Sequence, residues 1–251
     1  MNKKNIFNKI IGFIIIILCA FLGLLSYFQN RPLIDINEDI LRVYYFNVGQ
    51  ADCTLVVNNG QTMLIDGANE ADSQNIIDYM QINLVITKLD YVIVTHPDTD
   101  HIAGLNKIIL AFDIGCIYMP ITTKTNKEMN ELYDAIEDKT VIHPTASDYF
   151  YLGNSKCTIV TWNDIDVLKV SHHGSNDAIS QAFLESTKPE YSIISVGQDN
   201  SHNHPASETL ERLSNINSTV YITDEDGTII LISDGTSYYF DFDTTSLDGN
   251  K

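Results

Sequence analysis

The chain has 251 residues, with 33 Asp and Glu against 15 Lys and Arg, and a formal net charge of −18. All of the acidic residues lie beyond residue 32, so this part of the chain repels phosphate backbones and anionic membranes at long range. The charge excludes a protein that holds nucleic acid on a broad basic surface, while the hydrophobic content of 44% is that of an ordinary globular protein.

The N-terminal segment differs from the rest of the chain. Residues 10–28 carry no charge and are close in number to the roughly 20 that cross a bilayer core as a helix. Lys3, Lys4 and Lys9 precede them, which predicts a cytoplasmic N-terminus and an exported remainder. A cleaved signal peptide is the alternative, but small residues that favour cleavage do not follow. We therefore expect a transmembrane anchor and linker over residues 1–32 and one globular domain over residues 33–251, on the extracellular side of the cell membrane.

Beyond the anchor, short apolar runs alternate with amphipathic stretches. Runs rich in β-branched and aromatic residues predict strands over 41–48, 53–57, 62–65, 91–94, 117–119, 141–142, 156–162, 167–170, 191–196, 219–222, 228–232 and 237–240. Apolar residues at helical spacing predict helices over 70–84, 101–112, 127–137, 178–185 and 207–213. This order indicates an α/β fold with two sheets and helices outside them.

A group of metal-binding side chains follows the predicted strand at 91–94, in the sequence THPDTDH at 95–101. Alternate side chains of an extended backbone share a side, so His96 and Asp98 can converge on one point. Asp100 and His101 begin the next turn and face a second point close by. Such oxygen-rich sites are typical of two-metal hydrolytic centres. A solvated loop with chance histidines is the alternative, and the complete pattern disfavours it.

Two further clusters of potential ligands also follow predicted strands. They are SHHGS at 171–175, with His172 and His173, and a polar loop at 195–205, with His202 and His204. Clusters at strand ends gather at one edge of an α/β scaffold, so we expect one common site. One histidine of the 172–173 pair is expected to form hydrogen bonds instead of binding metal, and the sequence does not say which. His204 is expected either to contact substrate or to brace its loop.

These motifs, together with FNVGQADC at 46–53 and LIDGA at 64–68, resemble the metallo-β-lactamase fold over roughly residues 40–242. More narrowly, THPDTDHIAGL, DVLKVSHHGS and TDEDGTIILISDG, in this order, resemble the metallo-hydrolase domain of the bacterial DNA-uptake channel proteins of the ComEC-type competence family. The resemblance implies a four-layered αββα sandwich with a two-metal site at the sheet edge.

The resemblance also implies roles for residues at matching positions. His96 and Asp98 would hold one metal, Asp100 and His101 the other, and His172 or His173 would complete the set. Zinc or manganese is expected, because Asp98 makes the first site harder than a histidine would. A water shared by the metals would become a hydroxide that attacks a phosphodiester, and Asp100 could also orient this water.

Two further positions match the family. Asp66, in LIDGA, would support the ligand loop instead of binding metal, and His204 would line the substrate side.

The chain departs from the family between the strands predicted at 156–162 and 167–170. Relatives carry there a Gly-Asp whose carboxylate bridges the two metals, and this chain has neither the Gly-Asp nor room for the strands that would hold it. Asp164 and Asp166 are candidate substitutes, although Asp166 is better placed to cap a turn. We therefore expect a sandwich truncated near residue 163, with one metal bound well or two bound weakly, and reduced hydrolysis.

Three functions remain open. The first is a membrane-anchored metal-dependent hydrolase, a phosphodiesterase or nuclease of the competence-related type, acting on a phosphodiester, another small ester or DNA. The acidic surface favours a small substrate. The second is a pseudoenzyme that binds a partner without turnover, which the missing bridging aspartate favours and the complete metal loop opposes. The third is a thioester or lactam hydrolase, which would more naturally carry a histidine in place of Asp98.

Overall fold

The structure is a computed structural model that describes residues 35–159, 165–198 and 200–249. No helix within these ranges combines the length and the apolar character that crossing a bilayer requires. The anchor predicted over residues 1–32 lies outside the described residues, and so does Asp164.

Eight strands form the first and larger sheet. In sheet order they are β13 (Tyr238–Asp243), β12 (Thr228–Ser233), β1 (Leu41–Tyr45), β2 (Thr54–Asn58), β3 (Gln61–Ile65), β4 (Lys88–Ile93), β5 (Asp113–Tyr118) and β6 (Val141–Ile142). Neighbouring strands from β13 to β3 are antiparallel, whereas those from β3 to β6 are parallel, so the sheet is mixed. Asn59 and Gly60, both with positive φ, form the tight turn between β2 and β3.

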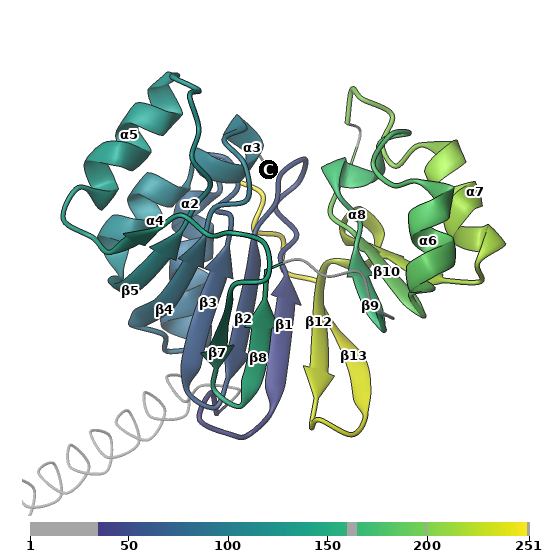
Figure 1. The fold of residues 1–251 in the computed structure, drawn as a ribbon, viewed down its shortest axis with the longest axis horizontal. Helices are drawn as coiled ribbons and strands as arrows, with labels where there is room; N and C mark the ends of the chain where they lie inside the picture. Colours follow the sequence, from purple (N-terminus) through teal and green to yellow (C-terminus); the bar gives the residue numbers. More distant parts are fainter. Residues whose placement is uncertain (1–34, 160–164, 199, 250–251) are drawn as a thin grey trace, which may run out of the picture.

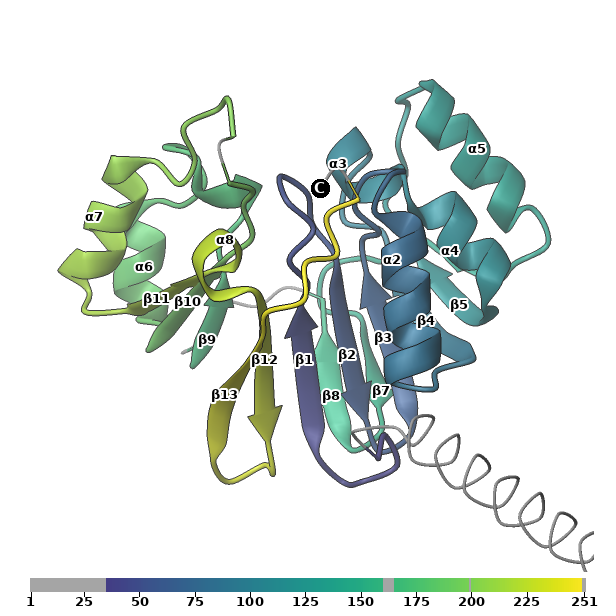
Figure 2. The same ribbon diagram turned by 180° about the vertical axis from the view of Figure 1, so that it is seen from behind.

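Helices cover one face of this sheet (Figures 1 and 2). They are α2 (Ser73–Asp78), which continues into a π-helical turn (Tyr79–Asn83), α3 (Thr99–Ile102), α4 (Leu105–Ala111) and α5 (Lys127–Ile136). Alternate strand residues point to this face, and Leu55, Leu64 and Val92 are fully buried there against Ile76 and Ile108. This layer is the main hydrophobic core.

Three parallel strands form the second sheet, in the order β11 (Thr219–Ile222), β10 (Tyr191–Ile194) and β9 (Val167–Lys169). Its outer face carries α6 (Gln181–Thr187) and α7 (Ser207–Asn215), where Leu184 and Leu213 are fully buried. A short helix, α8 (Thr223–Asp226), connects β11 to β12. The inner face packs on the first sheet, where Ile193 is buried with Tyr45 and Ile229.

A separate hairpin covers another part of the inner face of the first sheet. It consists of β7 (Tyr149–Leu152) and β8 (Ser155–Thr158), drawn in front of the larger sheet in Figure 1. Phe150 and Leu152 are buried there against Val56 and Met63. The prediction of an α/β fold with two sheets and helices outside them is confirmed, and this hairpin is an addition to it, since the sequence predicted no strand over β7.

The prediction of one continuous helix over residues 101–112 is wrong, because the chain forms two helices, α3 and α4, with an interruption at Gly104. A Cβ atom on Gly104 would lie 2.2 Å from the carbonyl oxygen of Gly67. The Gly67 N–H donates to the His101 carbonyl at 2.7 Å, and the Gly104 N–H donates to the Ala68 carbonyl at 3.0 Å. These two hydrogen bonds hold α3 against the loop that follows β3.

The loops that carry the predicted ligands meet at one edge of the molecule. β1, β3 and β4 run in the same direction, and so do β9 and β10. The loops after these strands gather at the upper side of Figure 1, between α3 and the second sheet. Side chains distant in sequence are thereby brought together.

Candidate metal centre

Asp66 lies behind the centre and fixes two of its neighbours. The Thr95 N–H donates to Asp66 Oδ1 at 2.9 Å, and the Thr95 hydroxyl donates to Oδ2 at 2.6 Å. His101 Nδ1 lies 2.7 Å from the same Oδ2. Asp66 is only 3% exposed, so these contacts occupy its carboxylate. The structure thus places Asp66 where it orients His101 and the ligand loop.

His173 is oriented in a similar way from the opposite side. It lies in a 3₁₀ turn (His172–Gly174) after β9, and its Nδ1 lies 2.8 Å from the carbonyl oxygen of Ser195, which follows β10. A carbonyl oxygen only accepts, so Nδ1 must carry the proton and donate it. His173 Nε2 then faces Asp100 Oδ2 at 2.9 Å. A neutral imidazole would direct a lone pair at a carboxylate there, which only a proton or a bound cation relieves.

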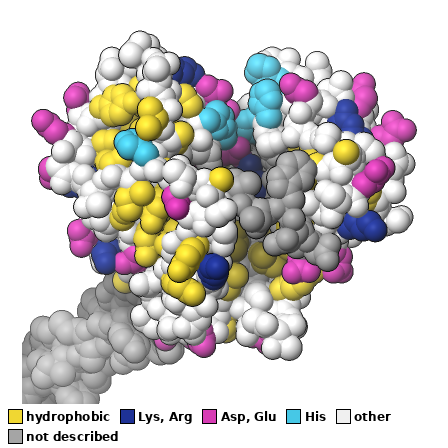
Figure 3. All heavy atoms as spheres, viewed as in Figure 1, with side chains coloured by type: hydrophobic (Ala, Val, Ile, Leu, Met, Phe, Trp, Pro, Cys, Tyr) yellow, Lys and Arg dark blue, Asp and Glu magenta, His cyan; other side chains and the backbone are white. Residues whose placement is uncertain are grey.

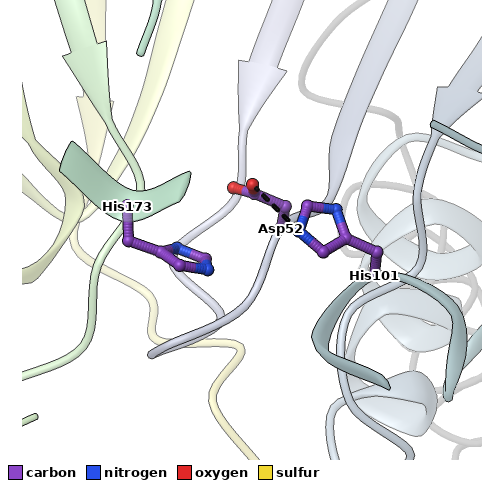
Figure 4. A group of neighbouring side chains, drawn as sticks. All are labelled: Asp52, His101 and His173. Carbon is purple, nitrogen blue, oxygen red and sulfur yellow. Dashed lines mark ion pairs between the residues drawn. The ribbon is translucent and has the colours of Figure 1, made fainter. Parts of the chain in front are cut away.

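Asp52 completes the group, and the loop between β1 and β2 holds it in place. Its N–H donates to the Asp100 carbonyl at 3.1 Å, and its own carbonyl accepts from the Ala68 N–H at 3.0 Å. Asp52 Oδ2 and Asp100 Oδ2 each lie 3.6 Å from His101 Nε2. Figure 4 shows Asp52, His101 and His173 pointing toward one another, and they offer ligand atoms that all lie within 4.8 Å of each other.

This donor set fits a divalent metal ion. Two imidazoles have their Nδ1 atoms engaged and present Nε2, and two carboxylates present oxygens to the same space. His101 and His173 are buried, Asp52 is 5% exposed, and the Asp100 side chain is 34% exposed. A mixed nitrogen and oxygen set of this kind suits zinc or manganese. The partial exposure of Asp100 leaves access for water.

His96 and Asp98 lie at the rim of the centre. The His96 ring centroid is 3.8 Å from that of His101, and His96 could form a second metal group with Asp66 and His101. The contacts of Asp66 make that group the weaker one. Asp98 Oδ2 lies 3.6 Å from His96 Nε2, but its Oδ1 pairs with Lys124 Nζ at 2.6 Å and its side chain is 56% exposed.

His172 and His204 line the open side of the centre. The His172 side chain is 65% exposed, and its ring centroid lies 5.7 Å from that of His204. A cavity of about 320 Å³ is bordered by both, by Gln50 and by Asp100 and His173. Figure 3 shows histidine side chains on both sides of the hollow between the two halves of the molecule. His204 therefore borders the cavity beside the centre, and its substrate role stays a prediction.

Neighbouring charges shift the pKa values of the ionisable side chains in the centre. Burial raises the pKa of Asp100, but the hydrogen bond with His173 and the charge of His101 outweigh it and lower the pKa to about 2. Burial also raises the pKa of Asp52, and Lys169 followed by His173 and His101 brings it below its usual value. Burial lowers the pKa of His101, while Asp66 and the other carboxylates raise it above its usual value. The carboxylates of Asp52 and Asp100 are therefore held in the deprotonated form that a metal ligand requires.

Sequence reasoning missed Asp52 and Lys169. Asp52 lies in the loop between β1 and β2, in a motif that carried the family resemblance, and its place in this motif was the available signal. Lys169 is the last residue of β9 and reaches Asp52 Oδ1 at 2.7 Å. The candidate substitute Asp166 precedes β9, at the end of that strand opposite the centre, and it is exposed.

The chain is similar to known proteins in sequence and in structure. The pattern of the metallo-beta-lactamase superfamily matches residues 46–135. The metallo-beta-lactamase fold protein YhfI from Bacillus subtilis has a similar structure, with a TM-score of 0.51 and 10% sequence identity, covering 78% of this chain and 100% of that chain. A structural likeness at this identity shows a common fold.

Two relatives are similar in sequence. ComE operon protein 3 from Bacillus subtilis (strain 168) is 27% identical over 192 residues, which cover 57% of this chain and 24% of that protein. Recombination protein 2 from Haemophilus influenzae (strain ATCC 51907 / DSM 11121 / KW20 / Rd) is 24% identical over 252 residues, covering 84% of this chain and 31% of that protein. The chain therefore corresponds to a third or less of the length of these relatives.

Proposed function

Because the chain is a metallo-β-lactamase-fold protein distantly related to ComE operon protein 3 and Recombination protein 2, we propose that it is a metal-dependent hydrolase of phosphodiesters. The observation that carries this proposal is the convergence of His101 Nε2, His173 Nε2 and the carboxylates of Asp52 and Asp100 on one space. Both imidazoles have their other nitrogen anchored, which is how proteins prepare histidines for a metal.

These four residues would hold a zinc or manganese ion. Bound there, the ion would lower the pKa of a water molecule and polarise the ester. Asp100, which is open to the cavity, orients the attacking water by accepting its hydrogen bond. His204 and Gln50 border the same cavity and are placed to contact the ester oxygens.

The size and charge of the site favour a small phosphodiester. A second cavity of about 410 Å³ borders the centre on the side of His96 and Lys169, and volumes of a few hundred Å³ suit small ligands. The net charge of −18 opposes long polyanions. The names of the two relatives point to competence and recombination, so nucleotide fragments are included in this substrate class.

We also propose the cellular setting from the sequence. The uncharged run at 10–28 with its preceding lysines supports a single-pass anchor and an extracellular domain over residues 33–251. The absence of a Gly-Asp between β8 and β9 supports an αββα sandwich shortened near residue 163.

Hydrolysis of bis(p-nitrophenyl) phosphate tests the activity. The chain is stripped with a chelator, reloaded with Zn²⁺ or Mn²⁺, and compared with His173→Ala and His143→Ala. His143 is the matched control, because its Nδ1 also lies 2.9 Å from a backbone carbonyl oxygen, that of Met119, but it lies outside the metal group.

We expect metal-dependent turnover that falls by about 100-fold or more in His173→Ala and stays unchanged in His143→Ala. A folded chain that shows no turnover with either metal contradicts the proposal and leaves the pseudoenzyme as the better explanation.

A further inference from the structure

Lys169 is a half-buried cation beside Asp52 in the centre, and strand geometry places it there. Side chains alternate along β9, so Val167 packs against the first sheet and Leu168 packs toward α6 and α7. Lys169 therefore points to the same side as Val167, into the gap between the sheets. Its side chain is only 24% exposed.

The ammonium of Lys169 occupies one oxygen of Asp52. Lys169 Nζ lies 2.7 Å from Asp52 Oδ1, and the Asp52 side chain is 7% exposed. Asp52 Oδ2 faces His101 Nε2. A carboxylate that bridges two metal ions through its two oxygens needs both of them free. Asp52 has one oxygen left, and it can serve one ion.

The charges of the group also balance with a single ion. Three carboxylates, those of Asp52, Asp66 and Asp100, contact the two histidines, and Lys169 neutralises one of these negative charges. One divalent ion compensates the other two. A second divalent ion would add two uncompensated positive charges to a largely buried site, which is costly.

The carboxylate at the rim does not change this balance. Asp98 is the additional acidic group beside His96, and Lys124 Nζ already neutralises it at 2.6 Å from Oδ1. Both carboxylates that would serve a second ion, Asp52 and Asp98, are thus paired with a lysine.

We propose that Lys169 takes the place of a second metal ion and limits the centre to one divalent ion per chain. The inference rests on the proposed function for the location of the first ion. It goes beyond that function by assigning the second positive charge of the centre to a side chain.

Metal stoichiometry tests the inference without reference to activity. The chain and its Lys169→Met variant are stripped with a chelator, saturated with Zn²⁺ or Mn²⁺, desalted, and analysed for bound metal by mass spectrometry. Lys139→Met is the matched control, because Lys139 is 27% exposed and pairs with Asp138 Oδ1 at 2.9 Å, on the surface. Lys169→Arg keeps the charge at the centre.

We expect one ion per chain in the unsubstituted protein, in Lys139→Met and in Lys169→Arg. We expect a second ion in Lys169→Met, with an affinity for it at least tenfold higher than in the unsubstituted chain. Two tightly bound ions in the unsubstituted chain would overturn the inference, and so would a folded Lys169→Met that still holds one.

Two further outcomes are separable. If Lys169→Met does not fold, Lys169→Leu replaces it, since leucine also removes the charge and leaves Asp52 Oδ1 free, and one ion in that variant also overturns the inference. No ion in the unsubstituted chain contradicts the proposed function itself, whereas one ion without turnover contradicts only the hydrolase activity and leaves the role of Lys169 intact.

Discussion

Replacing Asp66 by asparagine tests whether the support behind the ligands prepares the centre. Asp66 accepts hydrogen bonds from the Thr95 N–H and hydroxyl and contacts His101 Nδ1 at 2.7 Å, in a site that is 3% exposed. Asparagine keeps one acceptor oxygen, so at least one of these donors loses its partner. A hydrogen bond to a charged group contributes about 1.5–3 kcal/mol, and we expect Asp66→Asn to lower the free energy of unfolding of the metal-free protein by about 2 kcal/mol.

The effect on metal binding is the sharper part of this prediction. Without the carboxylate, His101 is no longer held with Nε2 toward Asp52 and Asp100. Loss of such a support weakens metal binding by about 10–100-fold, which corresponds to roughly 1.4–2.7 kcal/mol. Competition against a chromophoric chelator measures the dissociation constant.

A second buried aspartate supplies the control for Asp66→Asn. Asp72 accepts from the Asn69 N–H at 3.0 Å and the Gly249 N–H at 2.8 Å. Within the described residues it forms no hydrogen bond or ion pair with a histidine, so Asp72→Asn should lower stability and leave metal affinity unchanged. Equal metal affinities of Asp66→Asn and Asp72→Asn would refute the reasoning.

Three further predictions concern stability. Gly104→Ala should lower the free energy of unfolding by about 3 kcal/mol, because its Cβ would lie 2.2 Å from the Gly67 carbonyl oxygen. Urea denaturation measures the loss, and Gly235→Ala reports the cost of a positive φ alone, since its φ is 84° and a Cβ there meets nothing within 4 Å. Burial raises the pKa of Asp243, but hydrogen bonds with Thr245 and Tyr79 lower it below its usual value. Asp243→Asn should therefore destabilise the protein at pH 7, and this destabilisation should disappear as the pH falls below about 4. Thermal melts of both proteins across pH check the sign. Removing the metal should lower Tm and reloading should restore it, since an ion that binds only the folded state stabilises it by about 2.7 kcal/mol at 100 times its Kd; a Tm that does not respond to zinc contradicts a native metal site.

The sequence predicts well those features that depend on local pattern. The strands β2, β3, β4, β9 and β10 lie where alternating or continuous apolar runs indicate them, because a strand between two packed layers needs such residues. The position of the loop at 95–101, directly after β4, follows from the apolar run that predicts this strand. The chain's relation to the competence proteins could likewise be inferred from motif order alone.

Features that depend on packing were not predictable. Asp52 reaches the centre because its backbone pairs with Asp100 and Ala68, contacts between loops that no periodicity records. The choice between His172 and His173 depends on their consecutive left-handed backbone conformations, with φ of 48° and 52°, which turn one ring inward and the other outward. The interruption at Gly104 depends on the neighbouring loop and not on helix propensity.

The centre lies on the seam between two halves that have largely separate cores. The first half contributes Asp52, Asp100 and His101, and the second contributes Lys169 and His173. The contact below the seam is a small aromatic and aliphatic patch that includes Tyr45 and Ile193. A divalent ion bound by residues of both halves would link them, so metal binding would reduce how often the two halves separate and would slow proteolysis of the chain.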